Sequence, residues 1–265
     1  MKIVKLLVGL QACTFPSSFS FVTQNAPHRR HQTPVSSQSG LALMLDDGTR
    51  KSHSMAQNTQ FVTGFFKGLA NRDSYRSLVT SLYFVYKSME EAMDSTAEAR
   101  VQALDYPALR RIPSLKKDME FFYGKNWPSQ ILPSPAAKAY VARVQEVAGT
   151  KPYLLVAHQY TRYLGDLFGG QMMGGMASRS LNLANGDGTA FYSFDDIPNA
   201  KDFITEWYTC LNGLELTDEQ KEEIVDEANR VFDLNIGIFQ ELEGSAVKAM
   251  LTLAVNSLKS KLGFV

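Results

Sequence analysis

Several kinds of functional sequence are missing from this 265-residue chain. It has two cysteines, Cys13 and Cys210, and four histidines, and it carries no glycine-rich nucleotide-binding loop and no zinc-ligand cluster. Basic and acidic residues balance at 27 each, which argues against a nucleic-acid partner. No histidine follows a glutamate with two residues between them, so a di-iron site of the helical-bundle type is not predicted. The composition therefore favours a globular protein that acts on a small molecule.

Acidic residues are also absent from the first 45 positions, whose charged residues are Lys2, Lys5, Arg29 and Arg30. The apolar run at 3–10 is shorter than the roughly 20 helical residues that span a bilayer, and small residues follow it, as in a secretory signal. Residues 17–45 are rich in Ser, Gln, Thr and Pro, as transit peptides are. We therefore expect residues 1–45 to be a removable presequence. Its bipartite pattern resembles algal plastid leaders and predicts the plastid (chloroplast) stroma; a mitochondrial or disordered leader is the alternative.

Helical patterns dominate the remaining residues, 46–265, and predict a single all-α domain. Apolar residues recur at helical spacing over 75–89, with Asp73 as the expected N-cap. Further helices are expected at 114–123, 136–147, 199–211 and 217–243, and Pro152 is expected to open another. No alternating strand pattern and no apolar run of membrane-spanning length is present.

The end of the chain is expected to contain two helices rather than one. Thr217 and Gln220 form a capping box at the start of the first. Gly244 and Ser245 are expected to break it. Residues 245–265 would then form a separate amphipathic helix whose apolar face docks on the body of the protein.

Glycines interrupt the helix predicted after Pro152, in the run YTRYLGDLFGGQ at 160–171. Gly165 and Gly169 are four residues apart and so lie on nearly one helix face, although each weakens a helix by about 1 kcal/mol relative to alanine. Missing side chains let a backbone approach a flat ligand closely and let the helix bend over it. A tight helix–helix crossing explains the spacing equally well. Asp166 would lie beside a ligand opening and could order water there.

His53, in the run TRKSHSMA at 49–56, is the histidine that decides between these alternatives. An imidazole there can ligate a metal, but a lone histidine on a helix is more often a solvated residue. His158 is expected to be a buried, hydrogen-bonded core histidine rather than a second ligand. Cys210 is expected to be a small core residue without chemistry.

Together the two runs resemble those of heme oxygenases, most closely the cyanobacterial and plastid branch. The similarity extends over about residues 49–244 and includes SYR (74–76), LYFVY (82–86), MEE (89–91), YGKNW (123–127) and FQELEG (239–244). The resemblance implies a heme-oxygenase-like helical fold that holds heme between a proximal helix and a kinked distal helix. It also implies O2- and electron-dependent opening of heme to biliverdin, CO and Fe2+ in plastid bilin synthesis.

The resemblance assigns roles to individual residues. His53 matches the proximal ligand of heme iron, and Asp166 matches the distal aspartate whose water network supplies protons. Arg162 is expected to brace the distal helix through an ion pair. The remaining heme contacts implied are Gly165, Gly169 and Gly170 against the porphyrin, Tyr160 toward a propionate, and Arg50 and Gln57 near the proximal ligand. Electrons would come from reduced ferredoxin, and the product could pass to a bilin reductase.

The chain departs from the family pattern in three places. Gln57 replaces a glutamate that accepts the second imidazole proton, which predicts a less electron-donating ligand and an iron that is easier to reduce. Phe168 replaces a serine, and its ring is expected to pack behind the distal helix; the alternative is that it narrows the distal pocket. Ile204 and Tyr208 replace a lysine and an arginine that anchor the propionates, which leaves heme affinity and the biliverdin isomer open. The cations that could compensate are Lys201, Arg50 and Lys51.

These departures sustain a second hypothesis, a heme-oxygenase-like paralogue that holds porphyrin or regulates without turning it over. The presence of His53, Gly165 and Asp166 favours the enzyme, because the iron ligand and the proton-delivery residue are both retained. A third class, the helical thiamin-degrading enzymes, is not favoured, because the cysteine nucleophile that they need is not evident.

Overall fold

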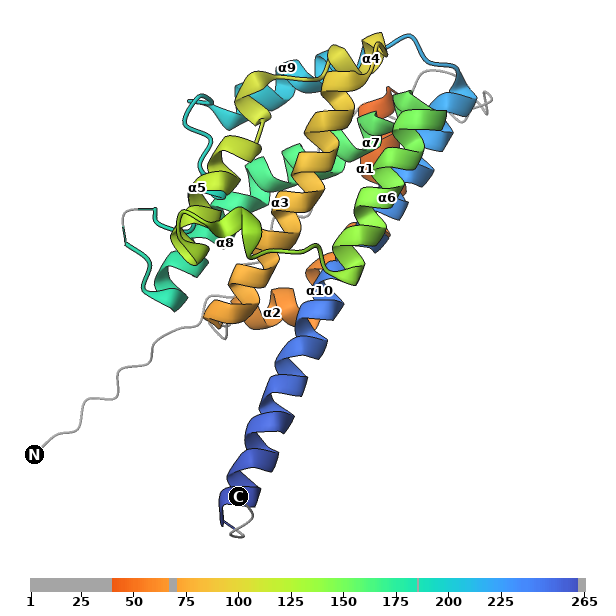
Figure 1. The fold of residues 1–265 in the computed structure, drawn as a ribbon. Helices are drawn as coiled ribbons and strands as arrows, with labels where there is room; N and C mark the ends of the chain where they lie inside the picture. Colours follow the sequence, from red (N-terminus) through yellow and green to blue (C-terminus); the bar gives the residue numbers. More distant parts are fainter. Residues whose placement is uncertain (1–39, 67–70, 185, 262–265) are drawn as a thin grey trace, which may run out of the picture. The chain divides into compact units, whose positions relative to one another are not determined.

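The computed structural model describes residues 40–66, 71–184 and 186–261, with side chains up to Gly244 except that of Phe66. Every regular element in these residues is helical, which confirms the all-α prediction. Most of the expected presequence, residues 1–39, lies outside the described residues. The longer helices (Figure 1) are α1 (Leu41–Gln57), α2 (Gln60–Phe66), α3 (Arg72–Ser95), α5 (Ile112–Tyr123), α6 (Pro135–Thr150), α8 (Gly165–Leu181), α9 (Ala200–Asn212) and α10 (Asp218–Lys261).

Short helical turns connect these elements. Two of them, α7 and the π-helical turn η4, run directly into α8, so that the segment from Leu155 to Leu181 is helical throughout. The short elements are α4 (Ala99–Gln102), η1 (Pro107–Leu109), η2 (Trp127–Ser129), η3 (Pro152–Leu154), α7 (Leu155–Gln159), η4 (Tyr160–Leu164) and η5 (Ala190–Tyr192).

The first helix starts earlier than the sequence suggested. It begins at Leu41, and Leu41 and Leu45 are 2% and 0% exposed. These leucines are four residues apart, so they share the face of α1 that is buried in the core. The folded domain therefore includes residues 41–45, which the composition of the leader had placed in the presequence.

Local capping chemistry explains several helix starts. Asn199 caps α9, and Thr217 and Gln220 exchange hydrogen bonds of 3.1 and 3.2 Å at the start of α10, as the capping box predicts. The N-cap of α3 is Asn71 rather than Asp73, because the Asn71 side chain accepts a hydrogen bond from Ser74 N at 2.7 Å. Both residues are of capping types, and the helix begins at the earlier one.

The last helix does not break where the sequence predicted. α10 continues through Gly244 and Ser245 to Lys261. One glycine costs a helix only about 1 kcal/mol, which the helical residues on both sides can offset. The expected docking of the apolar face of residues 245–265 concerns side chains outside those described.

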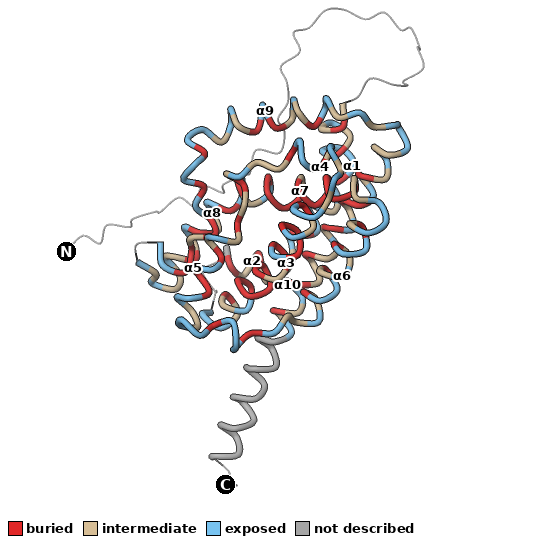
Figure 2. Tube along the Cα trace, turned by 45° about the horizontal axis from the view of Figure 1, so that its top comes forward, coloured by how far each residue is buried: buried red, intermediate tan, exposed pale blue. Residues whose placement is uncertain are grey.

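α10 is the helix around which the core is built. It packs against α1, α2, α3, α6 and α7, and α6 and α10 run side by side (Figure 1). Buried residues lie on the helix faces that turn toward one another (Figure 2). The largest fully buried side chains are Trp207, Tyr75, Tyr86, Tyr140, Tyr163, Phe65 and Phe191. Aromatic rings thus fill much of the interior between the helices.

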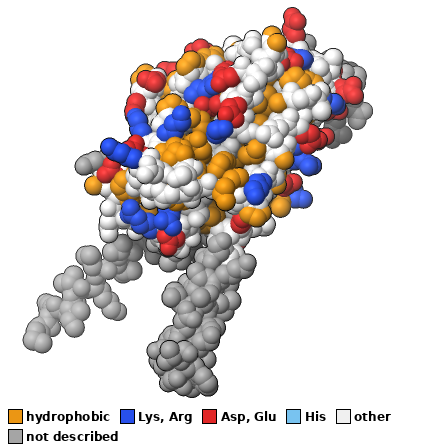
Figure 3. All heavy atoms as spheres, viewed as in Figure 1, with side chains coloured by type: hydrophobic (Ala, Val, Ile, Leu, Met, Phe, Trp, Pro, Cys, Tyr) orange, Lys and Arg blue, Asp and Glu red, His pale blue; other side chains and the backbone are white. Residues whose placement is uncertain are grey.

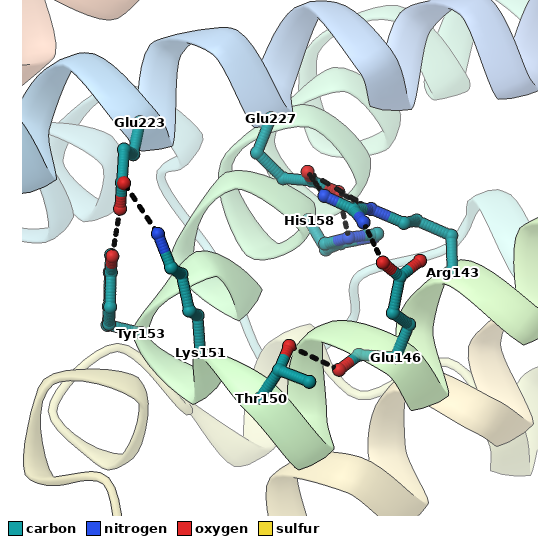
Figure 4. Close-up of polar contacts among 8 residues, drawn as sticks. All are labelled: Arg143, Glu146, Thr150, Lys151, Tyr153, His158, Glu223 and Glu227. Atoms are coloured by element: carbon teal, nitrogen blue, oxygen red, sulfur yellow. Dashed lines mark hydrogen bonds and ion pairs between the residues drawn. The ribbon is translucent and has the colours of Figure 1, made fainter.

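A buried carboxylate connects three helices (Figure 4). Glu227 of α10 accepts hydrogen bonds from Arg143 of α6 and lies 3.2 Å from His158 Nε2 of α7. Burial raises the pKa of Glu227, but His158 and Arg143 outweigh that effect and lower it, whereas burial lowers the pKa of His158. Glu227 is therefore ionised, and the His158 beside it is neutral. His158 is therefore a buried, hydrogen-bonded core residue, as predicted.

Charged side chains of both signs alternate around apolar ones on the face drawn in Figure 3. This mixture accords with the balanced charge of the sequence and gives that face no continuous field of one sign. Among the helices that the structure describes, none is both long enough and apolar enough to cross a membrane.

Candidate functional site

Two helical segments carry the residues that the sequence singled out. His53 lies near the C-terminal end of α1, and the glycines lie on α8 and are preceded by η4. The two segments meet where Thr49, four residues before His53, interacts with the hydroxyl of Tyr160, five residues before Gly165. The structure thus brings the two sequence motifs together at one end.

His53 is exposed on α1, and its ring packs against Phe232 of α10 with the ring centroids 5.7 Å apart. Enough protein surrounds the ring for burial to lower the pKa of His53, despite the opposing charge of Asp46. The imidazole is therefore mainly neutral at pH 7. A neutral, accessible imidazole is the form that can bind a metal ion.

Gln57 contacts His53 as expected, but with the opposite hydrogen-bond polarity. Its amide Nε2 lies 3.2 Å from His53 Nε2. An amide nitrogen can only donate, so the imidazole nitrogen that it faces accepts. In this arrangement Gln57 does not accept the second imidazole proton.

The glycines of α8 divide into two faces. A Cβ built on Gly165 or Gly169 would have no heavy atom of another residue within 4 Å. A Cβ on Gly170 would lie 2.9 Å from Tyr192 Cδ1, and one on Gly174 would lie 2.8 Å from Tyr192 Cβ. The first pair leaves open space for a ligand, and the second pair permits a close packing contact. Gly170, which the sequence assigned to the cofactor, packs against Tyr192.

The face of α8 that carries Gly165 and Gly169 is apolar and accessible. Phe168 and Met172 lie on the same face by helical spacing and are 50% and 48% exposed. Phe168 was expected to pack behind the helix, and the structure places it at the open face instead. The face thus offers bare backbone flanked by two large apolar side chains.

A π-helical turn interrupts the α-helical geometry of the segment that was expected to be kinked. η4 (Tyr160–Leu164) separates α7 from α8 and contains Arg162. Such turns are rare, arise from one extra residue in the helix and frequently occur at functional sites. The turn lies immediately before Gly165, so it sets the direction in which the glycine face points.

Asp166 lies in a buried polar cluster behind that face. It accepts hydrogen bonds from the Tyr86 hydroxyl and, at 3.0 Å, from Arg162, which confirms the expected ion pair. Arg162 also donates to Asn235 Oδ1 at 2.7 Å. Burial raises the pKa of Asp166, and Arg162, Tyr86 and Arg111 act against it. Four elements, α3, η4, α8 and α10, therefore fix one carboxylate.

Hydroxyl groups occupy the end where the two segments meet. Burial is the main cause of the raised pKa values of Tyr160 and Tyr208, which also interact with each other and with Asp46. Ile204 is 5% exposed and belongs to the core. Arg50, one turn before His53, is exposed and pairs with Asp47 at 2.5 Å and with Asp46 at 3.5 Å. Tyr160, Tyr208 and Asp46 therefore lie near one another where α1 meets η4.

Tyr192 was not predicted as part of the site, although two glycines of α8 pack against it. Asn235, which holds Arg162, was also missed. Both residues are distant in sequence from the YTRYLGDLFGGQ run, and neither belongs to a motif. A recess of about 430 Å³ between α1 and α10 is lined by none of the predicted site residues.

The chain is similar to known proteins over most of its length. The family model described as heme oxygenase matches residues 39–241. Heme oxygenase 1 of Synechocystis sp. is 48% identical over 219 residues, covering 82% of this chain and 91% of that protein. Heme oxygenase 1 of Nostoc sp. is 44% identical over 224 residues, covering 84% and 94%. The heme oxygenase of the alga Rhodella violacea is 42% identical, covering 83% and 94%.

A solved structure extends the agreement to three dimensions. The crystal structure of Synechocystis heme oxygenase-1 in complex with heme superposes with a TM-score of 0.77 at 47% identity. The match covers 83% of this chain and all of that one. The sequence motifs, the helical fold and these relatives together show that the chain belongs to the heme oxygenase family.

Proposed function

We propose that the protein is a heme oxygenase that opens heme to biliverdin, CO and Fe2+ with O2 and electrons. The observation that carries the proposal is the open face of α8 at Gly165 and Gly169. The bare face at Gly165 and Gly169 has room for a flat ligand, and His53 offers a neutral imidazole on the other segment. The solved Synechocystis relative binds heme, and the family membership of this chain supports the same substrate.

The described residues fit a heme substrate. His53 would ligate the iron, and the backbone at Gly165 and Gly169 would lie against the porphyrin between Phe168 and Met172. The bound heme supplies both the iron at which O2 is activated and the ring that is opened. With heme bound, the apolar side chains of Phe168 and Met172 would exclude water from the ring, and the glycines would let the backbone of α8 approach it closely.

Asp166 is the residue that would handle protons. Its carboxylate is oriented by Tyr86 and Arg162, so it cannot swing freely. Burial raises its pKa, which brings the carboxyl group closer to the pH at which it can take up and return a proton. Arg162 and Tyr86 would therefore be positioning residues, and Asp166 would act through water beside the open face.

The propionates would meet hydroxyl groups rather than cations. Tyr160 and Tyr208 lie at the end where α1 and η4 meet, and we propose that they hydrogen-bond the propionates there. Ile204 cannot contribute a charge. Arg50 could do so only by leaving Asp46 and Asp47. Binding through neutral hydroxyls should depend less on salt than binding through cations.

The cellular setting is part of the proposal. Reduced ferredoxin as the electron donor, a bilin reductase as recipient of the product, and the plastid stroma as location are supported by the leader and by cyanobacterial and algal relatives. The electron-donor protein would dock on the surface from which electrons can reach the heme edge.

One experiment tests the activity. The protein is mixed with hemin, and reduced ferredoxin and an iron chelator are added under air. Loss of the Soret band with growth of a biliverdin band is the expected result. In a parallel reaction, Asp166→Asn should keep the Soret band and lose most of the turnover. A Soret band that stays unchanged in the wild-type protein would contradict the proposed activity.

The second candidate is a porphyrin-binding paralogue without turnover. One observation favours it: Gln57 gives His53 no carboxylate partner. Stable hemin binding without any biliverdin would select this candidate, and absence of hemin binding to His53→Ala would identify the ligand in either case.

A further inference from the structure

One aromatic ring supports α8 on the side opposite its open face. Tyr192 is 7% exposed and lies so close to Gly170 and Gly174 that a Cβ on either would approach it to within 2.9 Å. Real Cβ atoms essentially never come that near, so any side chain at these positions would push α8 away from η5. The ring therefore fixes how closely α8 approaches the rest of the protein.

The backbone that carries Tyr192 is held on both sides. Asp118 of α5 accepts hydrogen bonds from Ala190 N and Phe191 N, both at 2.8 Å. Arg111 donates to the carbonyl oxygen of Ser193 at 2.6 Å. One buried carboxylate and one buried guanidinium thus fix the two ends of η5, so that the ring rests on a rigid support.

The same support reaches the proton-handling residue. Phe191 is 1% exposed, and its ring lies against Tyr86 with centroids 5.4 Å apart. Tyr86 in turn donates to Asp166. A displacement of η5 would therefore move the glycine face through Tyr192 and the Asp166 carboxylate through Phe191 and Tyr86.

We propose that Tyr192 is a positioning residue of the reaction, which sets the height of the Gly165–Gly169 face and of Asp166 above the substrate. This inference rests on the proposed function. Two glycines at 170 and 174 weaken α8 by about 1 kcal/mol each relative to alanine. If packing were the only requirement, alanines at these positions and a smaller residue at 192 would fill the same space without that cost. The need to hold α8 close to a flat substrate explains why the glycines are present despite this cost.

The first test needs no heme. Hydrogen exchange of the amides of residues 160–175 is compared in wild type, Tyr192→Phe and Tyr192→Ala. Leu104→Ala, at a fully buried leucine that follows α4, is the control for general loss of stability. We expect faster exchange in Tyr192→Ala than in Leu104→Ala at matched stability, and exchange like the wild type in Tyr192→Phe, which keeps the ring.

The second test uses the hemin complex. Tyr192→Ala should bind hemin with an affinity near that of the wild type but turn it over about ten- to a hundredfold more slowly, as misplacement by an ångström can cause. It should also release a broader mixture of biliverdin isomers, because the ring is held less exactly over one edge. Tyr192→Phe should restore both properties, and Leu104→Ala should change neither.

Two results would overturn the proposal: exchange in Tyr192→Ala that matches Leu104→Ala, or a folded Tyr192→Ala that keeps wild-type turnover and a single isomer. Failure of the proposed function looks different. In that case the wild-type protein itself would hold hemin without converting it, while the exchange comparison would still decide whether Tyr192 positions α8.

Discussion

Gln57 Nε2 lies 3.2 Å from His53 Nε2, so the amide contacts the outer nitrogen of the imidazole. A carboxylate partner would accept a ring proton and make the imidazole a stronger donor to a metal, whereas a neutral amide does not carry the charge to do so. Because Gln57 follows His53 by one helical turn, the two side chains are neighbours on the surface of α1. If His53 ligates iron as proposed, Gln57 gives it an uncharged neighbour where a carboxylate would make it a stronger donor.

Gln57→Glu should lower the midpoint potential of the bound heme. A carboxylate stabilises the ferric form by making His53 more electron-donating, and a tenfold change in that preference corresponds to about 59 mV for one electron. Spectroelectrochemistry of the hemin complex measures the shift. Gln57→Ala serves as the control without a partner, and an unchanged potential in Gln57→Glu would contradict the expectation.

Gly169→Ala and Gly170→Ala should have opposite effects on stability, although the positions are neighbours. The methyl group at 169 meets open space, so the apo protein should gain up to about 1 kcal/mol of helix stability. The methyl group at 170 meets Tyr192 and should cost about 1–3 kcal/mol. Urea unfolding of the apo proteins measures both.

The same two variants separate folding from substrate binding. Gly169→Ala should weaken hemin binding or slow its turnover, because its methyl group points to where the porphyrin would lie. Stabilisation by Gly170→Ala, or destabilisation by Gly169→Ala, would show that the two faces of α8 are assigned the wrong way round.

Tyr208→Arg should tighten hemin binding. A cation at this position can form charge-assisted hydrogen bonds with a propionate, each contributing about 1.5–3 kcal/mol, which corresponds to roughly tenfold or more in affinity. The gain should shrink as salt is raised, since the new contact is ionic. Hemin titrations in low and high salt measure it, with Tyr208→Phe as the uncharged control. Equal affinities of all three proteins would place the propionates elsewhere.

Asp118 should make stability depend on pH. Burial raises its pKa to about 6 from the ordinary 3.8, although the amides of Ala190 and Phe191 oppose the shift. The folded state therefore holds the proton more tightly than the unfolded state. Its contribution to the free energy of unfolding is fully present below about pH 4 and is lost as pH rises through 6.

The loss should amount to about 3 kcal/mol, since one unit of pKa corresponds to 1.36 kcal/mol. Unfolding by urea from pH 4 to 7.5 is compared for wild type and Asp118→Asn, which cannot ionise. The difference between the two free energies should fall over this range, and two parallel curves would rule the effect out.

Features decided by neighbouring residues could be predicted from the sequence. The capping box at Thr217 and Gln220 is an example, because both partners lie within one turn. Asn71 and Asp73 show the limit of such reasoning, as two capping residues compete and only the geometry of the helix start selects one. The continuity of α10 through Gly244 escaped prediction because it depends on many helical residues together.

Features decided by distant contacts could not be predicted. Gly169 and Gly170 are the same residue type at neighbouring positions. They differ in their surroundings because Tyr192 of η5 packs against Gly170 and not against Gly169. Phe168 is different: its helical spacing from Gly165 and Gly169 places it on the open face, so the sequence itself contained a signal that the expectation of burial overlooked. The family resemblance gave His53 and Asp166 their roles, whereas the partners Asn235 and Tyr192 emerged only from the fold.

The π-helical turn η4 has a consequence for angular register. One residue more than an α turn rotates everything after it by about 100° relative to an uninterrupted helix. Deleting one residue within 160–164 would therefore turn Asp166 toward the space now left by Gly165 and press Gln171 against Tyr192. A single inserted residue thus keeps Arg162 and Tyr163 in the interior while the bare backbone beyond them faces outward.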